Sequence, residues 1–201
     1  MLLGIDVGTT GAKAMVYTEE GEARGYAFRE YGIVYTKEGY ACQDAEHVWS
    51  RTKEAIREAV REEGRHIRCI SISVQGDAVI PVDCNRAAIG YAQLGMDYRG
   101  TEEVLICESR LGAEEIFART GMRPHPMNTF IKILWMKRHD RRLYEKTYKF
   151  VTYADFIMGK LGSGDIVIDY TMAARTQAFD LCEKRWSEDI LGAFDIDQGK
   201  L

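Results

Sequence analysis

The chain has 201 residues, of which 46% are hydrophobic and 29% charged, and its formal net charge is −4. The acidic balance argues against a nucleic-acid binder, which usually carries a basic face. No apolar run approaches the ~20 residues needed to cross a bilayer, so no membrane partner is expected. The five cysteines are scattered, odd in number and without a C-x-x-C pair. They favour reduced, mostly buried thiols in a cytoplasmic protein.

The first third of the chain predicts a β-meander followed by a helix and a strand. Three strands joined by tight turns are expected at residues 2–7, 12–18 and 23–31. Asp44 is predicted to cap a helix whose apolar residues recur at helical spacing, with Gly64 as its C′ residue. Residues 67–74 then predict a buried strand, which ends at Gln75.

The remaining residues predict an alternation of short elements, which indicates an α/β fold. Strands are expected at 78–82 and 148–151, and helices at 102–110, 113–120, from Asn128 or Thr129 onward, and 153–161. Two prolines keep residues 122–127 a loop. Lys132 stands among apolar residues and is interpreted as a surface lysine of an amphipathic helix. Residues 165–181 are expected to be extended and rich in turns, and Ser187 to cap a last helix.

The first predicted strand runs directly into a motif suited to phosphate. Asp6 can hold a hydrated divalent metal, because hard cations prefer carboxylate oxygens. Gly8 and Gly11 let the backbone turn tightly, with its N–H groups facing an anion. Two hydroxyls and a cation complete the motif, from Thr9, Thr10 and Lys13. The spacing matches neither the dinucleotide fingerprint nor the P-loop. An ordinary buried strand followed by a hairpin turn remains the alternative.

Polar residues also follow the later strands. Four of them stand where a predicted strand ends: Gln75, Asp77, Asp97 and Arg99. Ligands gather beyond the strand ends of open α/β sheets, so these residues are candidates for a small-molecule site. The alternative for each is a plain turn residue.

Taken in order, these motifs resemble the N-terminal domain of the FGGY carbohydrate kinases, such as xylulose kinase and glycerol kinase. The similarity runs along essentially the whole chain, residues 1–201. Four stretches carry it: 4–13, 39–44, 127–136 with its internal K-x-x-W, and 169–176. Four motifs in register argue against chance.

The resemblance implies a ribonuclease H-like domain of the actin, hexokinase and Hsp70 superfamily, with a mixed central sheet flanked by helices. It implies ATP and Mg²⁺ as co-substrates and a sugar or polyol hydroxyl as acceptor, with a ketopentose such as xylulose expected. By the same resemblance, Asp6 orients the metal through water. The residues implied to approach the phosphates are Gly8, Thr9, Thr10 and Lys13. The implied acceptor contacts are Gln75, Gly76, Asp77, Asp97, Arg99 and Met127.

Three departures from the family pattern leave the acceptor open. Gly76-Asp77 matches neither the Met-His of typical xylulose kinases nor the Arg-Glu of glycerol kinases. Gly95 stands where a tryptophan is common, and Met127 is not the tyrosine of glycerol kinases. These differences count against glycerol. A pocket without the tryptophan is expected to admit a larger or differently shaped acceptor.

The resemblance also implies that the catalytic aspartate lies beyond Leu201, in a C-terminal domain absent from this chain. The chain alone is therefore expected to have little or no kinase activity. Its uncovered face is expected to favour self-association into a homo-oligomer. Two alternatives stay open. The first is a non-catalytic sugar-binding or regulatory module, or one half of a split kinase. The second is a general ATPase domain. The motifs at 132–135 and 169–176 favour a sugar kinase over the general ATPase.

Overall fold

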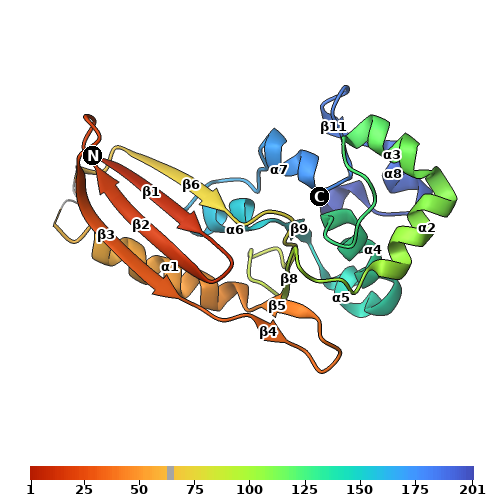
Figure 1. Ribbon diagram of the computed structural model, residues 1–201, viewed down its shortest axis with the longest axis horizontal. Helices are drawn as coiled ribbons and strands as arrows, with labels where there is room; N and C mark the ends of the chain where they lie inside the picture. The colour runs from red at the N-terminus through yellow and green to blue at the C-terminus, as the bar shows by residue number, and fades with distance from the viewer. Residues whose placement is uncertain (63–65) are drawn as a thin grey trace. The chain divides into compact units, whose positions relative to one another are not determined.

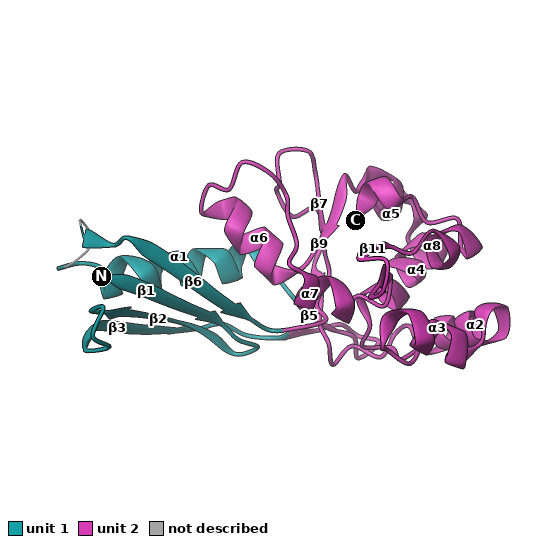
Figure 2. Cartoon of the chain, turned by 90° about the horizontal axis from the view of Figure 1, so that it is seen from above, with its two compact units in different colours: residues 1–33, 43–75 teal, residues 34–42, 76–201 magenta. Residues whose placement is uncertain are grey.

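The structure, a computed structural model, describes residues 1–62 and 66–201. The chain forms two compact units, 1–33 with 43–75 and 34–42 with 76–201 (Figure 2). The predicted helix end at Gly64 lies outside the described residues. Within the described ranges, no helix is long and apolar enough to cross a bilayer.

Unit 1 is built on a mixed sheet of strand order β3-β2-β1-β6 (Figure 1). Its strands are β1 (Leu2–Val7), β2 (Gly11–Tyr17), β3 (Ala23–Glu30) and β6 (Cys69–Val74). The first three form the predicted antiparallel meander, and β6 runs parallel to β1. Burial alternates along β1, with Leu3, Ile5 and Val7 in the core. One face of the sheet is therefore apolar and covered, as the period of two predicts.

Helix α1 (Ala45–Ala59) covers that apolar face. It begins where predicted, because the Asp44 carboxylate accepts hydrogen bonds from the N–H groups of Glu46 and His47 at 3.0 and 3.1 Å. The helix lies directly against β3 at Gly25. A Cβ atom at position 25 would stand 2.1 Å from the Ala59 carbonyl oxygen. Glycine is required at this point by contact with the helix.

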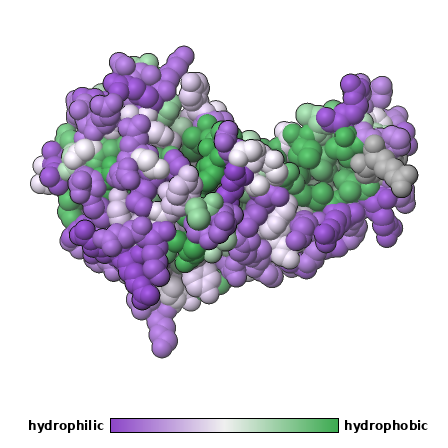
Figure 3. All heavy atoms as spheres, turned by 180° about the vertical axis from the view of Figure 1, so that it is seen from behind, coloured by the Kyte–Doolittle hydropathy of each residue, from purple (hydrophilic) through white to green (hydrophobic). Residues whose placement is uncertain are grey.

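Strand β6 does not have the predicted burial. Residues 67–74 were expected to form a buried strand, yet the side chain of Ile70 is 45% exposed and most of β6 is open to solvent. The reason is its place in the sheet: β6 pairs with β1 on one side, and no strand among the described residues pairs with the other. Its apolar residues leave part of the surface of unit 1 apolar (Figure 3).

Unit 2 combines small sheets with short helices. Its strands are β4 (Val34–Tyr35), β5 (Ala41–Gln43, whose last residue belongs to unit 1), β7 (Ile80–Val82), β8 (Ala92–Gln93), β9 (Lys149–Val151), β10 (Phe179–Asp180) and β11 (Arg185–Trp186). Its helices are α2 (Thr101–Leu111), α3 (Ala113–Thr120), α4 (Thr129–His139), α5 (Arg141–Lys146), α6 (Tyr153–Lys160), α7 (Tyr170–Arg175), α8 (Glu188–Ala193) and the 3₁₀ helix η2 (Gln198–Lys200). The sheets pair as β4-β5-β8, β7-β9 and β10-β11.

Helix α4 lies in the core of this unit. Seven of its residues are buried, including Phe130, Ile131 and Ile133. A helix buried on nearly all sides is expected to be apolar all round. The interpretation of Lys132 as a surface lysine was therefore wrong, since its side chain is 0% exposed.

Helices α5 and α7 were not predicted from the sequence. Residues 165–181 were expected to be extended, but 170–175 are helical. Both helices are too short to show a clear apolar period. Each is started by a local cap: Asp140 accepts from the N–H of Leu143, and Asp169 from those of Thr171 and Met172.

All five cysteines are free, as predicted, but they are not mostly buried. Cys42 and Cys107 are buried, whereas Cys69, Cys84 and Cys182 are exposed. The prediction of mostly buried thiols was therefore wrong for the three exposed residues. Burial raises the pKa of the Cys107 thiol to about 12, so it stays protonated at neutral pH.

Asp155, in the first turn of α6, makes stability depend on pH. Its Oδ2 atom accepts hydrogen bonds from the N–H and hydroxyl of Thr152 at 2.7 and 3.0 Å, while buried Oδ1 has no partner among the described residues. Burial raises the pKa of Asp155 from 3.8 to about 6. The folded protein therefore binds this proton more tightly than the unfolded chain. The stabilisation is fully present below pH 3.8 and is lost as the pH rises to about 6.

Asp155→Asn is expected to remove this dependence, because an amide keeps the acceptor for Thr152 and carries no charge. Relative to Asp155→Asn, the free energy of unfolding of the wild type should fall by on the order of 2 kcal/mol between about pH 4 and pH 6. Urea unfolding of both proteins across this range measures the difference. A difference that is constant with pH would contradict the prediction.

Candidate functional site

The predicted phosphate motif forms the tight turn between β1 and β2. The Gly8 N–H donates to the Gly11 carbonyl at 3.0 Å, which closes the turn. Tyr31, which directly follows β3, holds the turn in place. Its N–H donates to the Thr10 carbonyl at 3.1 Å and its hydroxyl donates to the Gly8 carbonyl at 2.6 Å. Burial raises the pKa of Tyr31, so its hydroxyl remains a donor.

Not every N–H group of this turn is free to face an anion. The Gly8 N–H is used inside the turn, and the contact of Gly8 with phosphate stays a prediction. Among the described residues, no partner is found for the N–H groups of Thr9 and Thr10, so these remain available for an anion. Gly11 is required for packing, because a Cβ atom there would stand 2.4 Å from the Phe28 ring.

Asp6 and Lys13 face each other across the first two strands. They are register partners, and Lys13 Nζ lies 3.4 Å from Asp6 Oδ2. The side chains are 46% and 55% exposed. An exposed, loosely paired couple contributes little to stability, so both groups can turn toward a metal or a phosphate. They open into a hollow of about 320 Å³ on the sheet, also lined by Gly4, Ile5, Met15, Tyr17, Tyr26, Ser71 and Ser73.

Gln75, a predicted acceptor contact, belongs to unit 1 and is linked to the phosphate turn. Its Nε2 donates to Gln43 Oε1 at 2.8 Å, and Gln43 Nε2 donates to the Thr9 carbonyl at 2.6 Å. These two hydrogen bonds between side-chain amides therefore connect Gln75 to the phosphate turn at Thr9. The predicted acceptor contact of Gln75 stays a prediction.

The remaining predicted acceptor residues belong to unit 2. Asp77 has a left-handed backbone, with φ at 62°, and its side chain is only 6% exposed. Both of its carboxylate oxygens accept from Arg175, at 3.0 and 2.5 Å. A Cβ atom at Gly95 would lie 3.5 Å from Asp77 Cβ and 3.5 Å from the Gly76 carbonyl. Gly95 therefore leaves the Gly76–Asp77 turn uncovered on that side.

Arg175 is a residue that sequence reasoning missed. It lies within the 169–176 motif, but at a position that carried no chemical signal of its own. Its partner Asp77 is 98 residues away in the chain. Such a bidentate pair fixes the orientation of the carboxylate as well as its charge.

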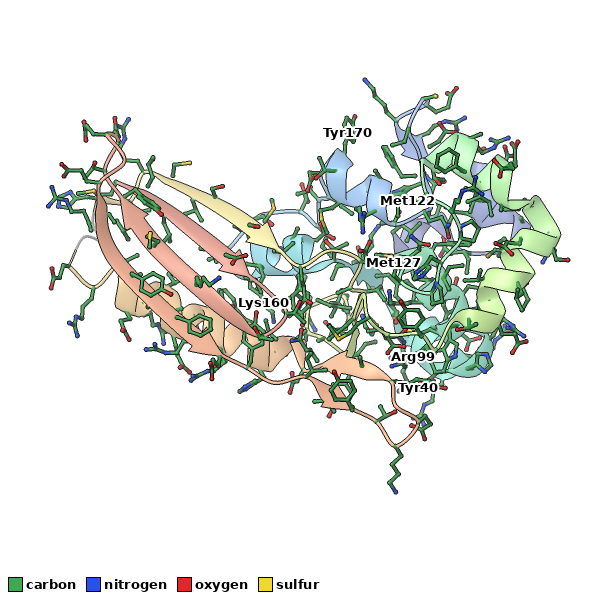
Figure 4. All side chains as sticks on the ribbon, in the orientation of Figure 1. Tyr40, Arg99, Met122, Met127, Lys160 and Tyr170 are labelled. Atoms are coloured by element: carbon green, nitrogen blue, oxygen red, sulfur yellow. The ribbon has the colours of Figure 1, made fainter. Side chains whose placement is uncertain are left out.

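Asp97 and Arg99 form a buried ion pair. Arg99 Nε lies 2.9 and 3.0 Å from the two carboxylate oxygens, and Nη2 lies 2.6 Å from Oδ2. The side chains of Arg99 and Tyr40 lie side by side (Figure 4), with the guanidinium carbon 4.3 Å from the ring centre of Tyr40. The same carbon stands 4.8 Å from the ring centre of Trp135. The Arg99 side chain is only 8% exposed. Two aromatic faces and a carboxylate thus hold this cation in one orientation.

Cys42 completes this cluster. Its Sγ atom accepts from Arg99 Nη2 at 2.8 Å, and burial raises the pKa of the thiol. The neutral sulfur is therefore a weak acceptor beside the ion pair. From its sequence, Cys42 was expected only to be a reduced cysteine within the 39–44 stretch.

Met127 ends the loop before α4. Its N–H donates to His125 Nδ1 at 3.1 Å, and its carbonyl accepts from Lys132 Nζ. Lys132 Nζ also donates to the Asp77 carbonyl at 3.0 Å. Burial lowers the pKa of Lys132 to about 7, although the carboxylates of Asp77 and Asp97 favour the charged form. One buried amino group thus joins two of the predicted acceptor residues.

The residues that the structure describes contain no cluster of three or more His, Cys, Asp or Glu side chains placed to hold a metal ion directly.

Comparison with known proteins defines the class. The chain superposes on a gluconate kinase from Lactobacillus acidophilus with a TM-score of 0.92 and 28% identity, over 100% of this chain and 40% of that one. A ligand-bound xylulose kinase from the same organism gives the same TM-score and identity, over 100% and 41%. The fold is therefore that of the sugar kinases, an α/β fold with a mixed sheet and flanking helices.

The family follows from the sequence match. Residues 1–201 match the family model described as the FGGY family of carbohydrate kinases, N-terminal domain, and the chain belongs to this family. It is 27% identical to the xylulose kinase of Staphylococcus xylosus, over 98% of this chain and 41% of that protein. It is also 27% identical to the glycerol kinase of Staphylococcus epidermidis, over 100% and 42%. The chain thus spans about two fifths of the length of these relatives.

Proposed function

We propose that residues 1–201 form the N-terminal domain of an ATP-dependent carbohydrate kinase that transfers the γ-phosphate to a hydroxyl of a sugar or polyol. This chain supplies the first phosphate motif and the acceptor-binding face. A ketopentose such as xylulose is the proposed acceptor. The observation that carries the proposal is the family match over all 201 residues, which includes both sets of candidate site residues.

The phosphate motif fits a nucleotide with a divalent metal. Asp6 would hold Mg²⁺ through water, since its carboxylate is half exposed beside the hollow. The unpartnered N–H groups and hydroxyls of Thr9 and Thr10 would face phosphate oxygens, and Lys13 would balance their charge. When bound, the metal would neutralise charge on the transferred phosphoryl group.

The acceptor face would be formed by Gly76, Asp77, Asp97, Arg99 and Met127. Both carboxylates are already held by arginines, so they are oriented before any ligand arrives. Prepositioned polar groups lower the entropic cost of binding a hydroxylated ligand. Catalysis would also need the general base and second phosphate loop that the family resemblance assigns to the C-terminal domain.

Calorimetric titration of this chain with xylulose, a hexulose, gluconate and glycerol tests the acceptor proposal. Saturable binding of a ketose, tighter than that of glycerol, is expected. Preference for glycerol would overturn the proposed acceptor class. Sugar binding by a full-length protein with no ATP-dependent phosphorylation would favour the non-catalytic binding module instead.

Kinase activity of residues 1–201 by themselves is expected to be very low, because the family resemblance assigns the general base and the second phosphate loop to a C-terminal domain. General-base help alone is worth ~10²–10⁴-fold in rate. A coupled assay of the 201-residue chain with ATP, Mg²⁺ and xylulose measures this. A turnover number of about 1 s⁻¹ or more, as in ordinary kinases, would contradict the prediction.

A further inference from the structure

Two residues one turn apart on α4 contact three loops that carry candidate acceptor residues. Lys132 and Trp135 are spaced i and i+3, so their side chains leave the same face of the helix. Lys132 donates to the carbonyls of Asp77 and Met127. Trp135 lies 4.8 Å from the guanidinium carbon of Arg99. The loops at Asp77, Asp97–Arg99 and Met127 are therefore all tied to one buried helix.

Burial of the Lys132 amino group is unfavourable by itself, which indicates that its hydrogen bonds have a role beyond filling space. The side chain is 0% exposed, and a buried ammonium is unfavourable unless hydrogen bonds replace its water. The two hydrogen-bond partners of its amino group are main-chain carbonyls of loops, and neither belongs to the core packing of α4. A methionine would fill the same space without that cost. The amino group thus serves the loops and adds nothing to the hydrophobic core.

Asp77 shows what the contact achieves. Its left-handed backbone is a strained conformation for a residue with a side chain. Lys132 holds its carbonyl and Arg175 its carboxylate, so the residue is fixed at both ends. Trp135 fixes the loop at Asp97–Arg99 in a similar manner. Together with Tyr40 it encloses the Arg99 guanidinium, which orients the carboxylate of Asp97.

We propose that Lys132 and Trp135 are positioning residues, which fix the three acceptor loops from α4 before the acceptor binds. The role at the acceptor rests on the proposed function. The geometry explains the K-x-x-W spacing: one helical turn separates the amino group that binds loop carbonyls from the ring that packs on a loop guanidinium.

The first test is amide hydrogen exchange on the 201-residue chain. Lys132→Met should speed exchange about tenfold or more in the segments around Asp77 and Met127, because two buried carbonyls lose their donor. Trp135→Phe should speed exchange around Asp97–Arg99 and leave the Met127 segment unchanged. Unchanged exchange in all three loops would overturn the proposal.

The matched control is Lys137→Met, on the same helix. Lys137 also donates to main-chain carbonyls, but to those of Phe194 and Asp195, away from the three loops. It should speed exchange after α8 only. If Lys137→Met and Lys132→Met loosened the same segments, Lys132 would be an ordinary structural lysine and the proposal would fail.

Sugar affinity provides a second readout, by calorimetry with the sugar that the wild type binds best. Lys132→Met should raise Kd about tenfold, Lys137→Met should leave it unchanged, and Lys132→Arg, which keeps the charge and donors, should recover part of the loss. If Lys132→Met does not fold, Lys132→Arg and Trp135→Phe carry the test. A wild type that binds no sugar would refute the proposed function, whereas exchange would still decide the role of Lys132. Equal sugar affinity of all variants would refute the positioning role alone.

Discussion

Replacing Asp97 with alanine is expected to lower the free energy of unfolding by about 3–5 kcal/mol, because it leaves the buried Arg99 guanidinium without its counterion. The Asp97 side chain is 0% exposed and that of Arg99 only 8%. Arg99 donates from both Nε and Nη2 to this carboxylate. Tyr40 and Trp135 enclose the cation, so it cannot turn to water without opening the cluster.

A double variant tells the contribution of the Asp97–Arg99 ion pair to stability apart from its contribution to sugar binding. Asp97→Ala with Arg99→Leu removes both charges and should recover a large part of the stability that Asp97→Ala loses. Sugar binding should be lost in Asp97→Ala and in the double variant alike, because both lack a proposed acceptor contact. Urea unfolding of the wild type, the two single variants and the double variant gives the coupling energy. Additive effects of the two changes would show that the pair does not act as a unit.

Gly95→Trp is expected to weaken binding of the preferred sugar about 100-fold or more, roughly 3 kcal/mol, while glycerol binding is retained. A side chain at position 95 starts 3.5 Å from Asp77 Cβ and from the Gly76 carbonyl. These are ordinary contacts, so the fold should accept the substitution. The indole ring would then cover the turn that carries two proposed acceptor contacts and reduce the space for a larger sugar.

Gly95→Ala is the control, since a methyl group at this distance fits and covers little. It should change the affinity for the sugar by less than about threefold. Calorimetry with a ketose and with glycerol compares the two variants. If Gly95→Trp bound both ligands like the wild type, the acceptor would have to lie elsewhere on unit 2, although the family assignment would stand.

Several features were predictable because their causes are local in the chain. The meander of β1, β2 and β3 follows from alternating apolar residues and short turns. Helix α1 begins directly after Asp44, because that carboxylate caps N–H groups of the first turn. The order of four motifs also sufficed to indicate the FGGY family, which the match over residues 1–201 confirms. The acceptor and phosphate contacts taken from that resemblance stay predictions.

Other features depend on contacts between distant parts of the chain, which no local period reveals. The carboxylate of Asp77 is held by Arg175, 98 residues away, and its carbonyl by Lys132, 55 residues away. Strand β6 looked buried from its apolar residues, but its burial depends on a neighbouring strand. The sequence by itself determined the β-meander, α1, several later elements and the family, but not the short helices α5 and α7. Only the tertiary structure decided that an apparent surface lysine lies buried between two candidate acceptor loops, because the burial of a side chain is set by what packs around it.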